Sequence, residues 1–167
     1  MLGGSDRALA DHSDDHLASS AVPNSDFDPL QALGQPAGGG GSEFLEPEIA
    51  FMLSTDARDA YTLVARFDIA DGYYLYRDRF DFAVTGAPGV ALDSTQLPDG
   101  KEKEDPYFGR MQVYYYSVEA VLQVQRATTE PVQLTLEIDY QGCAEAGLCY
   151  APMKRSVALT LPATPAQ

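Results

Sequence analysis

The sequence predicts an all-β protein, an immunoglobulin-like antiparallel β-sandwich. After residue 44, apolar and polar residues alternate in five segments, which puts one face of each strand into a core and the other into water. Turn signals rich in glycine, proline and aspartate separate these segments, and no window indicates a helix of ordinary length. Several short strands with regular turns between them are typical of a two-sheet sandwich.

The expected strands fall, in chain order, at residues 61–69, 80–84, 118–124, 132–140 and 157–161. The expected turns fall at residues 71–72, 86–89, 98–100 and 142. Tyrosine clusters at 73–76 and 114–116 have too many rings for simple alternation, and we expect most of these rings to pack in the core or on a sheet. The chain has no tryptophan and its cysteines are too close in sequence to bridge two sheets, which excludes an antibody-type domain.

Residues 1–43 differ from the predicted domain, residues 44–167. They are acidic, rich in serine, alanine and glycine, and cannot bury enough apolar surface to offset their ordering entropy. We therefore expect a flexible segment, within which Phe27–Leu33 is the patch able to dock on the domain. The run Gly38–Ser42 before Glu43 and Phe44 also resembles a cloning linker, so a native segment and an engineered join both stay open.

The composition limits the classes of partner. With 11 basic and 25 acidic residues the net charge is −14, which argues against nucleic acid or an anionic membrane as a partner. No apolar run reaches the length of a membrane span, so no direct membrane insertion is expected. Met1–Gly4 does not begin a signal peptide, so an exported protein would start here after its cleavage site. His12 and His16 flank two aspartates, but nothing orders these ligands, and we expect a solvated tail rather than a metal site.

The chain contains two cysteines, Cys143 and Cys149, which are either a structural staple or a redox centre. A disulfide that closes so short a ring removes only roughly 2 kcal/mol of unfolded-state entropy, which favours redox chemistry. The strand ending at Tyr140 runs into Cys143, and Cys149 leads towards the last strand, so the sulfurs are expected to face each other across a hairpin-like loop. The pair lacks both Cys-x-x-Cys spacing and a helix N-terminus to activate a thiolate. It is therefore better suited to a relay that a partner's thiolate attacks.

The segment 101–110 is charged and turn-forming, yet it carries two adjacent aromatic residues, Tyr107 and Phe108. An exposed loop that presents two rings is expected to close over something apolar.

Three motifs together, Asp71–Arg77, Glu104–Gly109 and Tyr140–Pro152, resemble the N-terminal periplasmic domain of the thiol:disulfide interchange protein DsbD. Phe44–Phe51 is similar to the start of that domain, and the resemblance covers about residues 44–161. It implies an immunoglobulin-like, periplasmic domain of an inner-membrane protein, with protein-disulfide reductase activity and no cofactor. The implied electron donor is the thioredoxin-like C-terminal domain of the same protein. The implied acceptors are periplasmic thioredoxin-fold proteins, such as a DsbC-like isomerase and a cytochrome c maturation thioredoxin.

The resemblance also implies roles for individual residues. Cys149 is expected to form the intermolecular mixed disulfide and Cys143 to resolve it. The implied cap over the pair comprises Asp105, Pro106, Tyr107, Phe108 and Gly109, and the residues implied to line the site are Tyr74, Tyr76 and Glu104. Tyr107 stands where the family has phenylalanine and Pro106 replaces an acid, which leaves open which ring sits on the sulfurs. The alternative function is a non-catalytic binding or assembly module with a structural disulfide.

Overall fold

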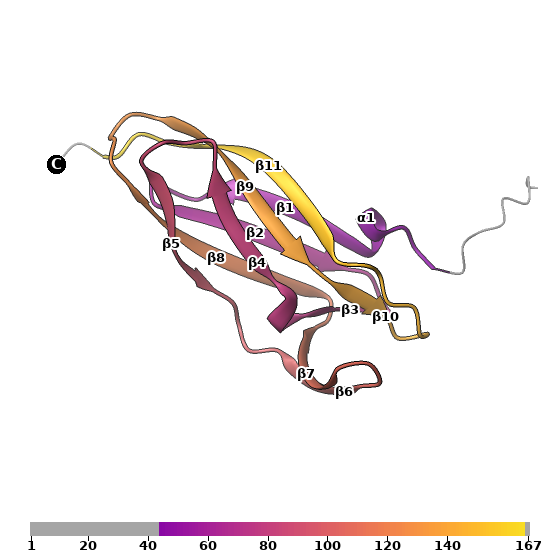
Figure 1. Ribbon diagram of the computed structural model, residues 1–167. Coiled ribbons are helices and arrows are strands. Elements are labelled where there is room, and N and C mark those ends of the chain that lie inside the picture. The colour runs from indigo at the N-terminus through magenta and orange to yellow at the C-terminus, as the bar shows by residue number, and fades with distance from the viewer. Residues whose placement is uncertain (1–43, 166–167) are drawn as a thin grey trace, which may run out of the picture. The chain divides into compact units, whose positions relative to one another are not determined.

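The structure, a computed structural model, describes residues 44–165, which form layered antiparallel sheets (Figure 1). The helical elements are α1 (Pro47–Ala50) and the 3-10 turn η2 (Arg77–Arg79). The strands are β1 (Phe51–Ala57), β2 (Thr62–Ile69), β3 (Tyr73–Tyr76), β4 (Asp81–Thr85), β5 (Val90–Gln96), β6 (Lys101–Asp105), β7 (Gly109–Tyr114), β8 (Ser117–Arg126), β9 (Val132–Tyr140), β10 (Gly142–Ala144) and β11 (Met153–Leu161). The predicted all-β class is confirmed.

The strands form three sheets, with the orders β1-β2-β8-β5, β11-β9-β4 and β10-β3-β7-β6. The first two form the layers of the sandwich, and the third lies at one end of them, where the β6–β7 hairpin projects (Figure 1). The β6–β7 hairpin and β10 both belong to this end sheet, with β3 between them, so the sheet brings the cysteine loop and the hairpin to the same end of the domain.

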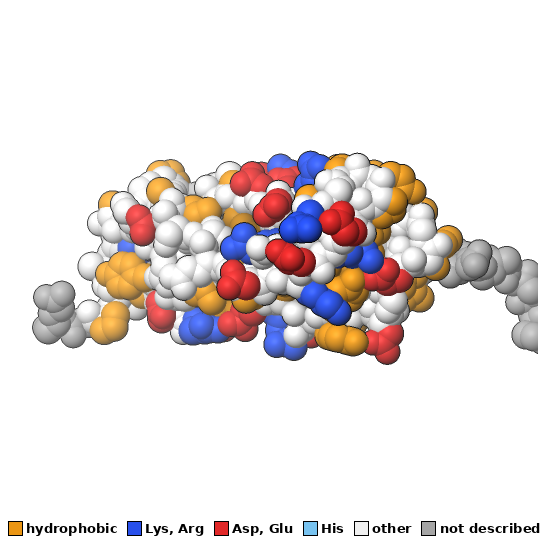
Figure 2. All heavy atoms as spheres, turned by 90° about the horizontal axis from the view of Figure 1, so that it is seen from below, with side chains coloured by type: hydrophobic (Ala, Val, Ile, Leu, Met, Phe, Trp, Pro, Cys, Tyr) orange, Lys and Arg blue, Asp and Glu red, His pale blue; other side chains and the backbone are white. Residues whose placement is uncertain are grey.

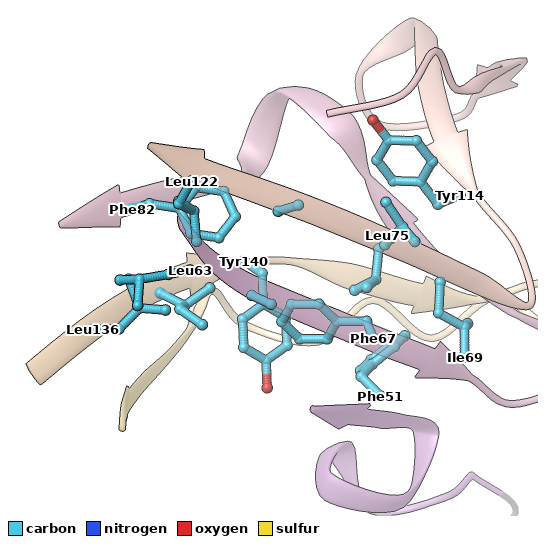
Figure 3. Packing of buried hydrophobic residues seen from close by; sticks show 14 of the residues in the cluster. Phe51, Leu63, Phe67, Ile69, Leu75, Phe82, Tyr114, Leu122, Leu136 and Tyr140 are labelled. Atoms are coloured by element: carbon cyan, nitrogen blue, oxygen red, sulfur yellow. The ribbon is translucent and has the colours of Figure 1, made fainter. Parts of the chain in front are cut away.

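The core lies between the two layers and is built from alternate residues of the long strands. In β9, for example, Leu134, Leu136, Ile138 and Tyr140 are buried while the residues between them are not. Phe67 of β2 packs against Tyr140 with ring centroids 4.8 Å apart (Figure 3). Burying each of these side chains contributes about 1.5–3 kcal/mol, so contacts of this kind between the layers stabilise the sandwich.

The five predicted strands correspond to β2, β4, β8, β9 and β11, while β1, β5 and the whole end sheet were missed. The expectation that residues 101–110 form a loop is wrong, because β6 and β7 pair from Lys101↔Val113 to Asp105↔Gly109 and leave a turn only at the tip. Backbone pairing rather than an apolar face holds these charged strands. Strand β3 was not predicted because all four of its residues are buried, so apolar and polar residues do not alternate along it.

The proposed flexible segment, residues 1–43, lies outside the described residues, together with His12 and His16. In the part of the chain that the structure describes, no helix has the length and apolar character needed to cross a membrane.

Candidate functional site

Cys143 and Cys149 are joined by a disulfide bond, with their Cα atoms 4.1 Å apart. Cys143 lies on β10, and the two residues also pair as a single antiparallel bridge. The predicted arrangement of facing sulfurs is therefore confirmed. The two cysteines are unequally accessible, because Cys143 is fully buried whereas Cys149 is only half-buried. An attacking group from outside meets Cys149 first.

The loop between the cysteines is held by its own backbone hydrogen bonds. The Ala144 N–H donates to the Leu148 carbonyl at 2.7 Å, and the Gly147 N–H donates to the Ala144 carbonyl at 3.0 Å. The Glu145 N–H reaches outside the loop, to the carbonyl of Gly72, at 2.8 Å. The loop therefore has a defined shape that does not depend on the disulfide alone.

Gly142, immediately before Cys143, lies where no other residue fits. A Cβ atom there would stand 2.5 Å from the Tyr74 carbonyl oxygen and 2.6 Å from Cζ of Phe51. This close approach presses β10 onto β3 and holds the Cys143 sulfur beside the tyrosines of that strand.

The Tyr76 hydroxyl connects the sulfurs to a buried carboxylate. It donates to Oδ2 of Asp105 at 2.6 Å and lies 3.1 Å from Sγ of Cys143 and 3.9 Å from Sγ of Cys149. The Tyr74 hydroxyl donates to the same Asp105 oxygen at 3.0 Å. Tyr74, Tyr76 and Asp105 are all buried, so these hydrogen bonds form in a low-dielectric environment.

The other oxygen of Asp105 organises the tip of the hairpin. Its Oδ1 accepts from the backbone N–H groups of Tyr107 at 2.8 Å and Phe108 at 3.1 Å. Pro106, which lies between Asp105 and Tyr107, has no backbone N–H that needs an acceptor. Gly109 ends the turn with a φ of 74°, in the left-handed region. One carboxylate thus ties the tip of the hairpin to the tyrosines that touch the sulfurs.

The pKa values of Asp105 and of the two tyrosines are shifted in opposite directions. Burial alone would raise the pKa of Asp105, but the bonds from Tyr76, Tyr107, Tyr74 and Phe108 hold the pKa of this carboxyl below its usual range. Burial raises the pKa of Tyr74 to about 12 and raises that of Tyr76 further. At neutral pH the site therefore holds one carboxylate and two neutral phenols.

Of the two rings at the tip of the hairpin, Phe108 is the one that packs onto the site. Its ring packs edge-on against the Tyr76 ring, with centroids 5.3 Å apart. The guanidinium of Arg79 lies 4.5 Å from the Phe108 ring centroid and makes a cation–π contact with it. Tyr107 is 65 % exposed and Phe108 40 %. The inner ring is Phe108, and Tyr107 faces solvent.

Most of the residues expected at the site come together, but the Glu104 side chain does not. It is exposed and pairs with Arg110 at 3.5 Å, because neighbouring residues of a strand point to opposite faces and Asp105 takes the inner one. Sequence reasoning missed Arg79, Lys103 and Glu145. The position of Lys103, two residues before Asp105 on the same strand face, was a usable signal.

The fold and site define an immunoglobulin-like domain with a single disulfide beneath an aromatic hairpin. Residues 41–161 match the family model described as "Thiol:disulfide interchange protein DsbD, N-terminal", and the chain belongs to this family. It is 44% identical to thiol:disulfide interchange protein DsbD 1 of Pseudomonas aeruginosa over 130 residues, which cover 78% of this chain and 21% of that protein. The DsbD protein of Neisseria meningitidis serogroup B is 40% identical over 114 residues, covering 67% and 18%. The chain thus spans about a fifth of the length of these relatives.

Two solved structures share the fold. The reduced N-terminal domain of Neisseria meningitidis DsbD matches with a TM-score of 0.60 and 36% identity, covering 69% of this chain and 88% of that one. The second structure is the complex between the DsbD N-terminal and the PilB N-terminal domains from the same organism. It matches with a TM-score of 0.59 and 34% identity, covering 70% of this chain and 88% of that one. These matches support the predicted immunoglobulin-like fold and family.

Proposed function

We propose that this domain is a periplasmic thiol–disulfide exchange relay, that is, a protein-disulfide reductase acting through Cys143 and Cys149. In this proposal it is one domain of an inner-membrane protein. It takes electrons from the thioredoxin-like C-terminal domain of that protein and passes them to periplasmic thioredoxin-fold proteins, among them a DsbC-like isomerase and a cytochrome c maturation thioredoxin. The observation that carries the proposal is the unequal exposure of the disulfide, in which Cys149 faces outward and Cys143 is buried behind it.

The exchange proceeds in two steps. A partner's thiolate attacks Sγ of Cys149, the Cys143–Cys149 bond breaks, and Cys143 leaves as a thiolate that takes up a proton. The partner's second thiol, as its thiolate, then attacks the mixed disulfide, which leaves the partner oxidised and both cysteines of this domain reduced. Transfer to a substrate runs the same steps in reverse, with Cys149 as the attacking thiolate and Cys143 resolving the mixed disulfide.

Tyr76 and Asp105 are suited to accommodate the buried sulfur in both states. Because the Tyr76 proton points to Asp105, the Tyr76 oxygen is free to accept from a thiol S–H on Cys143. The carboxylate beyond it disfavours a thiolate, so the reduced pair is kept as thiols and does not lose electrons to small oxidants. Phe108 and the rest of the cap, Asp105–Gly109, limit access further.

The alternative, a binding module with a structural staple, would use the disulfide to hold the loop. The backbone hydrogen bonds within residues 142–150 already do so, and the short ring stabilises by only about 2 kcal/mol. These facts favour exchange over stapling.

The test is direct transfer of electrons. The reduced protein is mixed with an oxidised thioredoxin-fold protein, the reaction is quenched with acid, and the free thiols of both are alkylated and counted by mass spectrometry. We expect two thiols to disappear from this chain as two appear on the acceptor, and a Cys143→Ala, Cys149→Ala variant to transfer none. Transfer no faster than to glutathione disulfide would refute the proposed relay.

A further inference from the structure

An ion pair joins the β6–β7 hairpin, called the cap hairpin below because its tip is the cap, to the loop between the cysteines. Nζ of Lys103, on β6, lies 3.0 Å and 2.8 Å from the two carboxylate oxygens of Glu145, which sits inside the ring closed by the disulfide. The two residues are 42 positions apart in sequence. Nothing in the exchange chemistry described above requires this pair.

The Glu145 end of the pair is firmly placed. Its backbone N–H donates to Gly72 at 2.8 Å, and its Oε1 also accepts from the Tyr115 hydroxyl at 2.6 Å. The hydrogen bonds from Lys103 and Tyr115 hold the pKa of Glu145 below its usual range, so the carboxylate stays charged at neutral pH. Glu145 therefore presents a charged, hydrogen-bonded carboxylate within the loop that joins the two cysteines.

Lys103 lies on the β6–β7 hairpin, whose tip is the cap that must open for a partner to reach Cys149. Its side chain is 20% exposed and its ammonium lies 4.7 Å from the ring centroid of Tyr74, one of the tyrosines bound to Asp105. The β6–β7 hairpin projects from the sandwich, and its tip, residues 105–109, contributes no side chain to the main core (Figure 1). Oppositely charged side chains lie next to one another across the face seen in Figure 2. The ion pair of Lys103 with Glu145 differs from such surface pairs in that it joins the hairpin to the cysteine loop.

We propose that Lys103 and Glu145 form an electrostatic latch that holds the cap hairpin closed and so limits access to Cys149. Lys103 is a positioning residue, since its ammonium contacts Glu145 and the Tyr74 ring and acts through the hairpin that carries Asp105 and Phe108. This inference deepens the proposed relay function, because access to Cys149 is what governs the rate of exchange.

The test measures reduction of the oxidised protein by tris(3-hydroxypropyl)phosphine. This reductant is uncharged, so the charge of Glu145 does not repel it. One phosphine and one water convert the disulfide to two thiols and a phosphine oxide. We expect Lys103→Met to be reduced about two- to fivefold faster than wild type, the range for loss of a partly exposed ion pair. The matched control is Lys154→Met, which removes the same charge from an exposed pair with Glu137 and Asp139 on β9.

Salt and charge exchange provide independent readouts. In about 1 M salt, where the screening length falls to about 3 Å, the wild-type rate should rise towards that of Lys103→Met, while the variant's rate stays nearly constant. The double variant Lys103→Glu, Glu145→Lys should be reduced at a rate closer to that of wild type. In Lys103→Met, the backbone amides of Tyr107 and Phe108 should exchange hydrogen faster than they do in wild type. If Lys103→Met were impaired in folding, Glu145→Gln, at an exposed position, gives the same expectation.

The latch is refuted if Lys103→Met is reduced at the wild-type rate, if Lys154→Met accelerates reduction equally, or if the charge-exchanged variant stays as fast as Lys103→Met. This outcome is separate from the fate of the proposed relay. Faster phosphine reduction supports the latch even if no thioredoxin-fold protein accepts electrons from this domain. Conversely, electron transfer without any effect of Lys103→Met would refute the latch alone.

Discussion

Replacing Asp105 with asparagine is expected to destabilise the oxidised domain by about 2 kcal/mol at pH 7. Asp105 is 5% exposed and its carboxylate accepts four hydrogen bonds, two from tyrosine hydroxyls and two from backbone N–H groups. The asparagine oxygen can still accept from the amides of Tyr107 and Phe108. Its NH₂ group, however, faces Tyr74 and Tyr76, so each charge-assisted bond from a tyrosine hydroxyl is replaced by a neutral bond in which the tyrosine oxygen accepts.

The magnitude follows from the change in the two tyrosine bonds. A hydrogen bond to a charged group contributes about 1.5–3 kcal/mol and a neutral one about 0.5–1.5 kcal/mol, so each tyrosine bond loses roughly 1 kcal/mol. The matched control is Asp139→Asn, since Asp139 is an exposed partner of Lys154. An exposed pair of this kind contributes no more than about 1 kcal/mol.

The assay is urea unfolding of the oxidised protein as a function of pH. Because the folded-state pKa of Asp105 is lowered, the stability that its charge contributes is present above the unfolded-state value of about 3.9 and is lost as pH falls through the folded value. The difference between wild type and Asp105→Asn should thus be constant from about pH 5.5 to 7 and shrink below about pH 4. Equal stability at pH 7, or a difference that grows in acid, would show that the charge of Asp105 does not stabilise the folded domain.

Three further comparisons of variants test the cap, the packing before Cys143 and the backbone at Tyr116. Phe108→Ala should speed reduction by the neutral phosphine several-fold more than Tyr107→Ala, because Phe108 is the inner ring; the reverse order of rates would contradict this assignment. Gly142→Ala should lower the free energy of unfolding by at least ~2 kcal/mol in thermal denaturation, since its Cβ would overlap the Tyr74 carbonyl, and a neutral effect would be inconsistent with the packing. Tyr116 has a φ of 64°, so Tyr116→Gly should be more stable than Tyr116→Ala by about 1 kcal/mol, the opposite of the order expected at an ordinary position.

Sequence reasoning found strands where one face is apolar. Alternation located β8 and β9, each of which buries every second residue. It failed for β6, whose residues Lys101–Glu104 are charged and whose order comes from pairing with β7. It failed as well for β3, where burial on both faces removes the period. Patterns of single residues do not carry information about which strand pairs with which.

The site could be predicted only in part for a similar reason. The spacing of Cys143 and Cys149 predicted that they face each other, and the family resemblance predicted Asp105 and Tyr76 near them. The structure has the disulfide, and the Tyr76 hydroxyl lies within hydrogen-bond distance of both Asp105 and the Cys143 sulfur. The contact of Lys103 with Glu145 depends on the angle at which the hairpin meets the cysteine loop, which no local pattern encodes. Glu104 is exposed because side chains alternate between the two faces of β6, and this could not be predicted while residues 101–110 were expected to form a loop.

In the proposed relay, Cys149 is the outward, exchanging sulfur and Cys143 resolves the mixed disulfide. Trapping with single-cysteine variants tests it most directly. Cys143→Ser and Cys149→Ser are each incubated with a thioredoxin-fold protein that lacks its own resolving cysteine and is activated as a mixed disulfide with nitrothiobenzoate. We expect a covalent complex to form rapidly through Cys149 in Cys143→Ser and much more slowly in Cys149→Ser, because Cys143 is fully buried. Equal rates for the two variants, or no complex with either, would show that Cys149 is not the exchanging sulfur.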